Sequence, residues 1–291
     1  MESSNRPVEP PAGPESPSLK PVRPVAPVAP YLGGKRHLAE RLGDLIGEVP
    51  HDTYAEPFIG MGGVFFRRKS RPRCEVINDI SRDVINLFRI LNHHYPQFMD
   101  VLKYQITSRD EFERLAGQNP DSLTDMQRAA RFLYLQRTAF GGKIVGRTFG
   151  IAPGTAGRFD VNRLAPDLAE VHERLSGVII ERLPWADLVS RWDRPGTLFY
   201  CDPPYWNCET DYGAGVFGKD DFERLAQVLA GISGRFILSI NDAPEIRSIF
   251  AAFHCSVIET TYSIAEAASQ KVNELVFTNI DPAVRRQASL L

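Results

Sequence analysis

The sequence predicts an α/β fold in which a largely parallel β-sheet is interrupted by an inserted, mostly helical region. Two short apolar runs end in motifs that stop a strand, the glycine turn of residues 60–63 and the Asp-Pro-Pro of residues 202–204. Strand and helix patterns alternate around both motifs, which is typical of sheets built from strand–helix–strand units. Between residues 93 and 177 this alternation is lost, and the stretch is therefore predicted to be the insertion.

The composition is that of an ordinary globular protein. The chain has 291 residues, 43% hydrophobic and 24% charged, enough for one large domain or two modest ones. No apolar run approaches the roughly 20 residues that span a bilayer, and no secretory signal is apparent. The four cysteines show no metal-ligand spacing. We therefore expect a cytoplasmic protein with reduced thiols, no membrane association and no metal.

The first 29 residues are rich in proline and poor in large apolar side chains. Such a segment cannot bury enough surface to offset the entropy that it loses on ordering. Residues 1–29 are therefore predicted to form a disordered or polyproline tail. A passive tail is favoured over a docking segment.

Residues 30–35, Pro-Tyr-Leu-Gly-Gly-Lys, precede an apolar pattern with the spacing of one helix face, between residues 38 and 46. The adjacent glycines allow the backbone to approach a ligand closely. Lys35 stands where the helix is expected to open. The alternative is an ordinary glycine turn before an amphipathic helix, with Lys35 merely solvated.

The next motif is more specific. Residues 53–55 can form a strand, Glu56 follows it, and the turn around Gly60 and Gly62 leads into a helix predicted to begin near Val64. This order is the cofactor-binding start of a Rossmann-type sheet. The glycine spacing matches neither the dinucleotide fingerprint nor a phosphate-binding loop. A glycine turn with an acid just before it suits an adenosyl ligand without phosphates.

The second predicted strand, residues 74–78, ends at Asp79. In Rossmann-type sites an acid at the end of the second strand binds the ribose hydroxyls of the ligand. The alternative is that Asp79 caps a helix through the apolar run of residues 84–88. The glycine turn upstream favours ribose binding.

The insertion contains a basic segment. Residues 109–135 are predicted to be helical, and a loop rich in glycine and arginine follows at 137–158. Residues 128–163 carry a net charge of +6, in a chain whose formal net charge is −2. Basic residues interleaved with aromatic ones are the expected footprint of nucleic-acid binding, although most charge clusters are solvated faces. The candidate DNA contacts are Arg137, Lys143, Arg147 and Arg158.

The central motif follows a short apolar run, residues 198–201, which is predicted to be a buried strand. Pro203 and Pro204 cannot donate to a sheet ladder, so they end the strand. They fix the Asp202 carboxylate and the Tyr205 ring at the carboxyl end of the strand, where open α/β sheets bind ligands. The alternative is a plain turn with Tyr205 half-buried.

The remaining pattern completes the sheet. Residues 178–183 and 236–240 are predicted strands, and residues 257–264 and 275–278 are predicted to pair antiparallel. Residues 205–217 are polar and contain glycine, which is typical of a mobile loop at the mouth of a site.

Four motifs now stand in one order, Tyr31-Leu-Gly-Gly-Lys35, Glu56-Pro-Phe-Ile-Gly-Met-Gly62, Asn78-Asp79 and Asp202-Pro-Pro-Tyr205. With them the chain resembles the Dam-like family of DNA adenine methyltransferases, which methylate the exocyclic amino group of adenine. The resemblance spans roughly residues 30–280 and includes residues 132–137 and 273–279.

The resemblance implies a Rossmann-like, S-adenosylmethionine-dependent methyltransferase sheet formed by residues 30–92 and 178–291, with residues 93–177 as the target-recognition domain. It implies S-adenosylmethionine as the cofactor and double-stranded DNA as the partner. We expect a monomer or weak dimer. The residues that it assigns to the cofactor are Tyr31, Lys35, Phe58, the turn from Gly60 to Gly62, Asp79 at the ribose, and Asp202 beside the methyl donor.

The chemistry implied for the motif follows from the weak nucleophilicity of the adenine amino nitrogen, whose lone pair is delocalised into the ring. Asp202 and the Pro203 carbonyl would each accept a hydrogen bond from the amino group, which localises the lone pair toward the methyl donor. Pro204 would shape this motif, and Tyr205 would stack on an adenine that has flipped out of the duplex.

Two other functions stay open. An enzyme of the same fold could methylate RNA or a protein amide, although Asp-Pro-Pro-Tyr fits the DNA-adenine group better than the Asn-Pro-Pro-Tyr typical of glutamine methylation. A non-catalytic DNA-binding module could have kept the fold. The chain departs from the family at Tyr31, where tryptophan is more common. It also departs in residues 141–158, so no target sequence is carried over.

Overall fold

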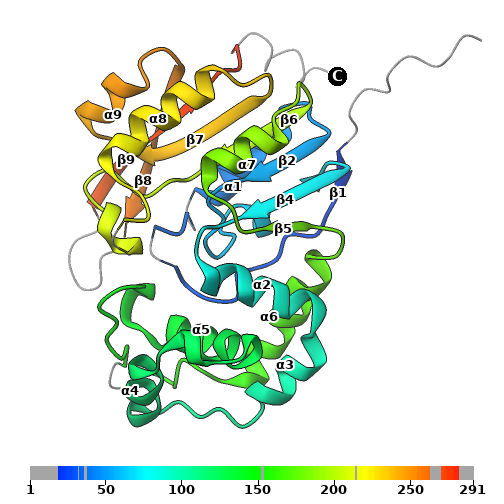
Figure 1. Ribbon diagram of the computed structural model, residues 1–291, viewed down its shortest axis with the longest axis vertical. Helices are drawn as coiled ribbons and strands as arrows, with labels where there is room; N and C mark the ends of the chain where they lie inside the picture. The colour runs from blue at the N-terminus through cyan, green and yellow to red at the C-terminus, as the bar shows by residue number, and fades with distance from the viewer. Residues whose placement is uncertain are drawn as a thin grey trace, which may run out of the picture.

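A seven-stranded sheet with helices on both faces forms the centre of the molecule (Figure 1). The computed structural model describes residues 19–31, 33–35, 38–151, 154–213, 215–262 and 270–281. The strand order is β5-β4-β2-β6-β7-β9-β8. The first five are parallel: β5 (Ile179–Glu181), β4 (Cys74–Asn78), β2 (Thr53–Glu56), β6 (Thr197–Cys201) and β7 (Arg235–Asn241). The sequence-based prediction of an α/β fold with a largely parallel sheet is thus confirmed.

The last two strands are antiparallel, as predicted. β8 (His254–Tyr262) pairs with β9 (Gln270–Thr278), and β9 lies between β8 and β7. The predicted strand at 257–264 reaches into residues 263–269, which lie outside the described residues. Because β9 runs against β7, its central residues meet the carboxyl end of the parallel strands.

Side chains alternate between the two faces of the sheet, and each face has its own hydrophobic core. Residues such as Tyr54 and Leu198 pack on one face with α1 (Ala39–Gly47) and α2 (Arg82–His93). Their neighbours, such as Ala55 and Phe199, pack on the other face with three further helices. These are α7 (Trp185–Trp192), α8 (Lys219–Ala230) and α9 (Pro244–Ile249). All five residues of β6 are buried, because side chains of a strand alternate between the two faces and both are covered here.

The order of the strands defines where a ligand can bind. From β2 the chain passes to β4 and β5 on one side, and it later returns through β6 and β7 on the other. The crevice at such a reversal, beyond the carboxyl ends of the strands, is the usual ligand site of open α/β sheets. The glycine turn follows β2 and Asp202 follows β6, so both motifs flank the reversal.

The inserted region is helical and lies below the sheet in Figure 1. It comprises α3 (Tyr95–Leu102), α4 (Arg109–Gly117), α5 (Asp125–Thr138) and α6 (Val161–Arg174). The predicted helix at 109–135 is two helices, because Gly117 and Pro120 interrupt the pattern. The hydroxyls of Ser108 and Thr124 cap the two helices, the second with Gln127 in a capping box.

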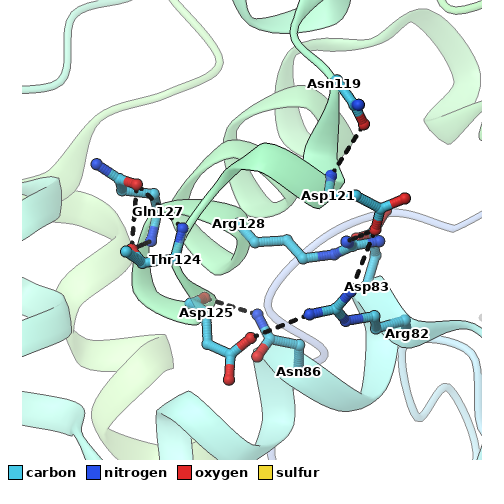
Figure 2. Close-up of polar contacts among 9 residues, drawn as sticks. All are labelled: Arg82, Asp83, Asn86, Asn119, Asp121, Thr124, Asp125, Gln127 and Arg128. Carbon is cyan, nitrogen blue, oxygen red and sulfur yellow. Dashed lines mark hydrogen bonds and ion pairs between the residues drawn. The ribbon is translucent and has the colours of Figure 1, made fainter.

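Two ionic clusters join the insertion to the rest of the fold, one to the sheet and one to helix α2. Arg174, at the end of α6, donates to both carboxylate oxygens of Glu75 on β4 at 2.6 and 2.7 Å. Figure 2 shows the other cluster, in which Arg128 of α5 donates to Asp83 of α2 at 2.5 Å and to Asp121 at 2.7 Å. The insertion is therefore fixed to the helix that directly follows Asp79.

The helix predicted near Val64 is not formed. The glycine turn leads only into a single 3-10 turn, η1 (Phe65–Arg67), and Arg68 is already extended. The chain then enters β3 (Ser70–Arg71), which pairs with β1 (Lys20–Pro21). Pairing with the N-terminal segment uses the residues that a longer helix would need.

The sequence predicted a disordered or polyproline tail over residues 1–29. Residues 19–29 are instead packed against the rest of the fold, and residues 1–18 lie outside the described residues. Residues 19–30, called the arm here, cross the molecule in extended form. Val25, Val28 and Ala29 are buried in the core shared by the sheet and the insertion. Arg137 of α5 donates to the Val28 carbonyl at 2.7 Å. The few apolar residues among the prolines are enough to hold the arm in place, because side chains of both the sheet and the insertion cover them.

The arm is expected to contribute to stability through Val28, which is fully buried. Val28→Ala should lower the free energy of unfolding by about 1–3 kcal/mol, the usual cost of a small cavity in a core. Arg23→Ala is the control, because Arg23 is exposed and pairs only with Glu170 on the surface. Urea denaturation tests both variants. Equal stability of the two would contradict this placement of the arm.

Candidate active site at the carboxyl edge of the sheet

A cavity of about 950 Å³ opens at the reversal point of the sheet. Its lining comes from the arm, from residues 57–63 after β2, from residues 79–81 after β4 and from residues 202–217 after β6. Ligand pockets of proteins typically measure about 300–1,000 Å³. The cavity thus unites segments that are far apart in the sequence but that meet at one edge of the sheet.

The glycine turn forms one wall of the cavity. Gly60 and Gly62 have φ angles of +51° and +71°. A Cβ atom on Gly60 would lie 3.0 Å from the Tyr31 ring, and one on Gly62 would lie 2.4 Å from the Phe66 ring. Both the backbone conformation and the space therefore require glycine here. The turn exposes backbone to the cavity at the place that the sequence predicted.

Asp79 holds this turn in place. Its carboxylate accepts hydrogen bonds from the backbone N–H groups of Gly60 at 3.0 Å and Ser81 at 2.8 Å. Burial raises the pKa of Asp79 to about 6, although these two hydrogen bonds oppose the shift. The cap of α2 is Ser81 and not Asp79, so the alternative role predicted for Asp79 is wrong. Asp79 lines the cavity and has lone pairs left to accept further hydrogen bonds.

Aromatic rings line two other sides of the cavity. Phe58 lies 6.3 Å from Trp185 and 5.9 Å from Phe217, measured between ring centroids. The ring centroids of Tyr31 and Tyr212 are 6.1 Å apart. Gly33 lies against Tyr212, since a Cβ atom on Gly33 would approach the Tyr212 hydroxyl to 2.6 Å. Flat apolar walls of this kind favour a ligand with a planar ring.

Lys35 connects the arm side of the cavity to Asp202. Its Nζ lies 2.8 Å from the Asp202 carboxylate, 2.7 Å from the Glu274 carboxylate and 2.7 Å from the Tyr205 hydroxyl. Tyr205 in turn donates to Glu274 at 2.8 Å. Lys35 is 2% exposed, so its ammonium is held among these groups and is not solvated. It precedes α1 by four residues and does not itself begin that helix.

The Asp202 carboxyl has an unusual environment for an acid. Burial raises the pKa of Asp202 to about 6, and the neighbouring Glu274 charge raises it as well. The Lys35 ammonium opposes both effects through its charge and its hydrogen bond. Asp202 is therefore mostly ionised at neutral pH and can accept a proton or a hydrogen bond from a ligand.

Four of the predicted catalytic and cofactor-binding residues are not among the described residues that line the cavity: Glu56, Gly62, Pro203 and Tyr205. Glu56 is buried beneath the turn and accepts a hydrogen bond from the Tyr54 hydroxyl at 2.5 Å. Burial raises the pKa of Glu56 to about 8, so it is mostly protonated at neutral pH. This position indicates that Glu56 stabilises β2 and does not contact a ligand. Pro204 does line the cavity.

The basic segment divides into two groups. Arg128 and Arg131 are 6% and 7% exposed. Arg128 donates to Asp83 of α2 and Arg131 donates to the Leu115 carbonyl, so both belong to the fold (Figure 2 shows Arg128). Arg137 and Arg147, two of the candidate DNA contacts, are half-buried. They donate to the Val28 carbonyl and to the Gln136 side chain at 2.7 and 3.3 Å.

The other two candidates, Lys143 and Arg158, are exposed. They lie near the mouth of the cavity, because Arg137 and Ile144 are among its lining residues. The exposed charge of the segment is thus smaller than its composition indicates, but it is concentrated beside the cavity.

Sequence reasoning missed three residues of the site: Tyr212, Phe217 and Glu274. The first two lie in the loop of residues 205–217, whose start is anchored by Asn241 at 2.9 Å from the Trp206 N–H. Glu274 carried a signal, since it is an acid directly before the apolar run Leu275–Phe277 of β9. Only the antiparallel register of β9 brings it to Lys35.

Other kinds of site receive no support from the described part of the chain. Among the residues that the structure describes, no three histidines, cysteines or acids gather where they could hold a metal ion. Within the same residues, none of the helices has the length and apolar content needed to cross a membrane.

Comparison with known proteins gives one family. A sequence profile described as D12 class N6 adenine-specific DNA methyltransferase matches residues 31–264. That range contains the glycine turn, Asp79 and the Asp-Pro-Pro-Tyr motif together with the whole insertion.

Three individual relatives have low sequence identity to this chain, but each match covers most of this chain and most of the relative. The type II methyltransferase M.CviBI of Paramecium bursaria Chlorella virus NC1A is 24% identical over 85% of this chain and 95% of its own. The type II methyltransferase M1.LlaDCHI of Lactococcus lactis subsp. cremoris is 24% identical over 86% of this chain and 93% of its own. The DNA adenine methylase of Serratia marcescens is 25% identical, over 77% and 88%.

Proposed function

The chain belongs to the D12 class N6 adenine-specific DNA methyltransferase family, and from this we propose that it transfers a methyl group from S-adenosylmethionine to the exocyclic amino group of an adenine flipped out of double-stranded DNA. The observation that carries the proposal is that Asp202 lines the same cavity as the glycine turn and Asp79. One cavity can then hold the methyl donor and the acceptor base side by side.

The residues of the cavity fit S-adenosylmethionine. The walls at Gly60 and Gly33 have no room for a Cβ atom, so backbone there can lie against a ligand. Asp79 would accept from the ribose hydroxyls, and the rings of Phe58 and Trp185 would hold the planar base. When bound, the donor supplies an electrophilic methyl group on a positively charged sulfur atom. Carboxylates near that charge favour its binding over that of a neutral analogue.

At the acceptor, Asp202 accepts a hydrogen bond from the adenine amino group and the Pro203 carbonyl accepts the second. Together they localise the lone pair of the nitrogen and orient it for attack. Lys35 keeps Asp202 ionised, since its ammonium opposes the increase in pKa that burial causes. Asp202 thus acts by position and charge, and it can take the proton that the amino group loses.

Access to the amino group requires base flipping, because stacked duplex DNA hides it from a side chain. Tyr205 is half-buried beside Asp202, and its ring would stack on the extruded adenine. Stacking of a base on an aromatic side chain contributes about 1–3 kcal/mol.

The duplex would lie along the basic side of the cavity mouth. There Lys143 and Arg158 are exposed together with the apolar side chains of Phe140, Val145 and Ile151. Exposed cations suit phosphates, and exposed apolar groups suit a disturbed base stack. We propose a monomer or weak dimer that works in the cytoplasm, where its DNA substrate is.

Removal of the exposed charges is expected to weaken DNA binding without altering the fold. Lys143→Ala and Arg158→Ala should each weaken binding several-fold and reduce the salt slope of log Kd by about 1, the value for one lost phosphate contact. Lys69→Ala is the control, because Lys69 is exposed, lies outside the basic segment and pairs with Glu40 and Asp44. Fluorescence anisotropy at several salt concentrations measures both quantities. Identical slopes for all three variants would contradict the assignment of this surface.

An acceptor comparison tests the proposed function. The protein is incubated with S-adenosylmethionine labelled in the methyl group and with unmethylated duplex DNA, RNA or a glutamine-containing peptide. We expect label in the DNA alone. Label in RNA or peptide would move the assignment to the other acceptors, and DNA binding without cofactor affinity would favour a non-catalytic module.

A further inference from the structure

Glu274 is a buried acid in the middle of β9. It lies on β9 opposite Asn241 of β7, followed by the buried residues Leu275, Val276 and Phe277. Glu274 itself is 1% exposed. A carboxylate in such a place costs free energy unless charged or hydrogen-bonding partners compensate it. The partners that it has therefore indicate why it is there.

Both carboxylate oxygens of Glu274 are used, each by a different residue of the site. One oxygen lies 2.7 Å from Lys35 Nζ, and the other accepts from the Tyr205 hydroxyl at 2.8 Å. Lys35 also donates to the Tyr205 hydroxyl at 2.7 Å, which closes a triangle. A closed set of three short contacts fixes all three groups relative to one another.

This triangle ends on the reacting group. The Lys35 ammonium that Glu274 holds also lies 2.8 Å from Asp202. Glu274 is not among the described residues that line the cavity, so it acts through its neighbours and not on a ligand. Neutralisation of Lys35 alone does not explain it, because Asp202 already supplies one counter-charge. The second oxygen, on Tyr205, shows that orientation is involved as well.

We propose that Glu274 is the positioning residue of the active site: it holds Lys35 against Asp202 and fixes Tyr205 at the place of the target adenine. The proposal rests on the proposed function, and it adds a residue from the last strand to the motifs around Asp202. It makes β9, which is antiparallel to the rest of the catalytic edge, part of the machinery for methyl transfer.

The charge of Glu274 also acts on Asp202. Other ionisable groups near Asp202 are Glu56 on β2, Tyr200 and Cys201 on β6, and Tyr212 in the loop of residues 205–217. Burial raises the pKa of each of them, so they are uncharged or mostly so at neutral pH. Lys35 and Glu274 are then the charges that set the ionisation of Asp202. Removal of the negative charge of Glu274 should lower the pKa of Asp202.

Glu274→Gln and Tyr205→Phe test the two sides of the triangle. We expect each to lower the single-turnover rate of methyl transfer roughly 10- to 100-fold, the usual effect of misplacing a reacting group, while the Kd for S-adenosylmethionine stays within about threefold. The double variant should lose less than the product of the two single effects, because both act on one network. For Glu274→Gln the acid limb of the pH–rate profile should also move to lower pH.

Thr278→Val is the matched control. Thr278 lies on the same strand and is buried, and its hydroxyl donates to the Phe236 carbonyl at 2.7 Å, away from Asp202. It should lose stability but keep the wild-type rate and pH profile. A merely structural role of Glu274 would give Glu274→Gln the same result as this control.

A second readout does not depend on turnover. In protein with 13C-labelled aspartate carboxyl groups, the Asp202 resonance is assigned by its loss in Asp202→Asn and is titrated by NMR. We expect the Asp202 pKa to fall in Glu274→Gln and to stay unchanged in Thr278→Val. If Glu274→Gln does not fold, the single-turnover rate of Tyr205→Phe decides by the same expectation.

The outcomes separate the two proposals. An active wild type with unaffected Glu274→Gln rate and Asp202 titration would overturn the role of Glu274 alone. A wild type that transfers no methyl group would overturn the proposed function, while a lowered Asp202 pKa in Glu274→Gln would still support the coupling.

Discussion

Asp202→Ala is expected to abolish methyl transfer, with a loss of roughly a thousandfold or more in the single-turnover rate. The variant removes the carboxylate proposed to accept from the amino group, which would leave the nitrogen lone pair delocalised into the ring. Affinity for S-adenosylmethionine should be retained, because the glycine turn and Asp79 are held by contacts that do not involve Asp202. Rapid-quench kinetics measure the first quantity and calorimetry the second.

Asp220→Ala is the control for this experiment. Asp220 is an exposed carboxylate in the first turn of α8. Its replacement should leave both rate and affinity unchanged. Normal turnover by Asp202→Ala, or a loss of cofactor binding as large as the loss of rate, would contradict the role given to Asp202.

Lys35→Met is expected to have the second largest effect, on both stability and activity. It keeps the length of the side chain but leaves the Asp202 and Glu274 carboxylates near each other without the cation between them. Breaking a buried ion pair from one side typically costs about 3–5 kcal/mol. The rate at neutral pH should fall at least about a hundredfold, since Asp202 would be both displaced and largely protonated.

The direction of the pH shift expected for Lys35→Met follows from the groups around Asp202. Burial raises the pKa of Asp202 to about 6 and Lys35 lowers it, so loss of Lys35 raises the pKa further. The acid limb of the rate profile should then move to higher pH, opposite to the shift expected for Glu274→Gln. A carboxyl whose pKa is raised on folding destabilises the native state most above that pKa. The loss of stability should therefore be larger at pH 8 than at pH 5.

Urea denaturation at the two pH values and a pH–rate profile measure these effects. Lys69→Met is the control, because Lys69 is an exposed lysine whose ion pairs lie at the surface. A stability loss in Lys35→Met that is independent of pH, or an acid limb that moves to lower pH, would contradict the network described here.

The fold, and the edge of the sheet that carries the site, could be predicted because both depend on local features of the sequence. Glycines at 60 and 62 and prolines at 203 and 204 restrict the backbone wherever they stand, so they locate strand ends without knowledge of the fold. Once the strands are parallel, their carboxyl ends meet at one edge. This is why Gly60, Asp79 and Asp202 could be placed together from the sequence.

What could not be predicted depends on partners distant in the sequence. The charges of Arg128 and Arg131 counted toward a DNA surface, but Asp83 of α2 and the Leu115 carbonyl bind them within the fold. Residues 19–29 were predicted to be disordered, because their few apolar side chains are covered only by distant elements. Glu274 is the strongest case, since its role exists only in the register that sets β9 beside β7.

Asp202 is proposed to direct methyl transfer to the amino nitrogen of adenine in DNA. The most direct test treats unmethylated genomic DNA with S-adenosylmethionine labelled in the methyl group, digests it to nucleosides and analyses them by mass spectrometry. We expect labelled N6-methyladenine with the wild type and none with Asp202→Ala. Label on cytosine or on a ring nitrogen of adenine, or equal label with both proteins, would contradict the claim.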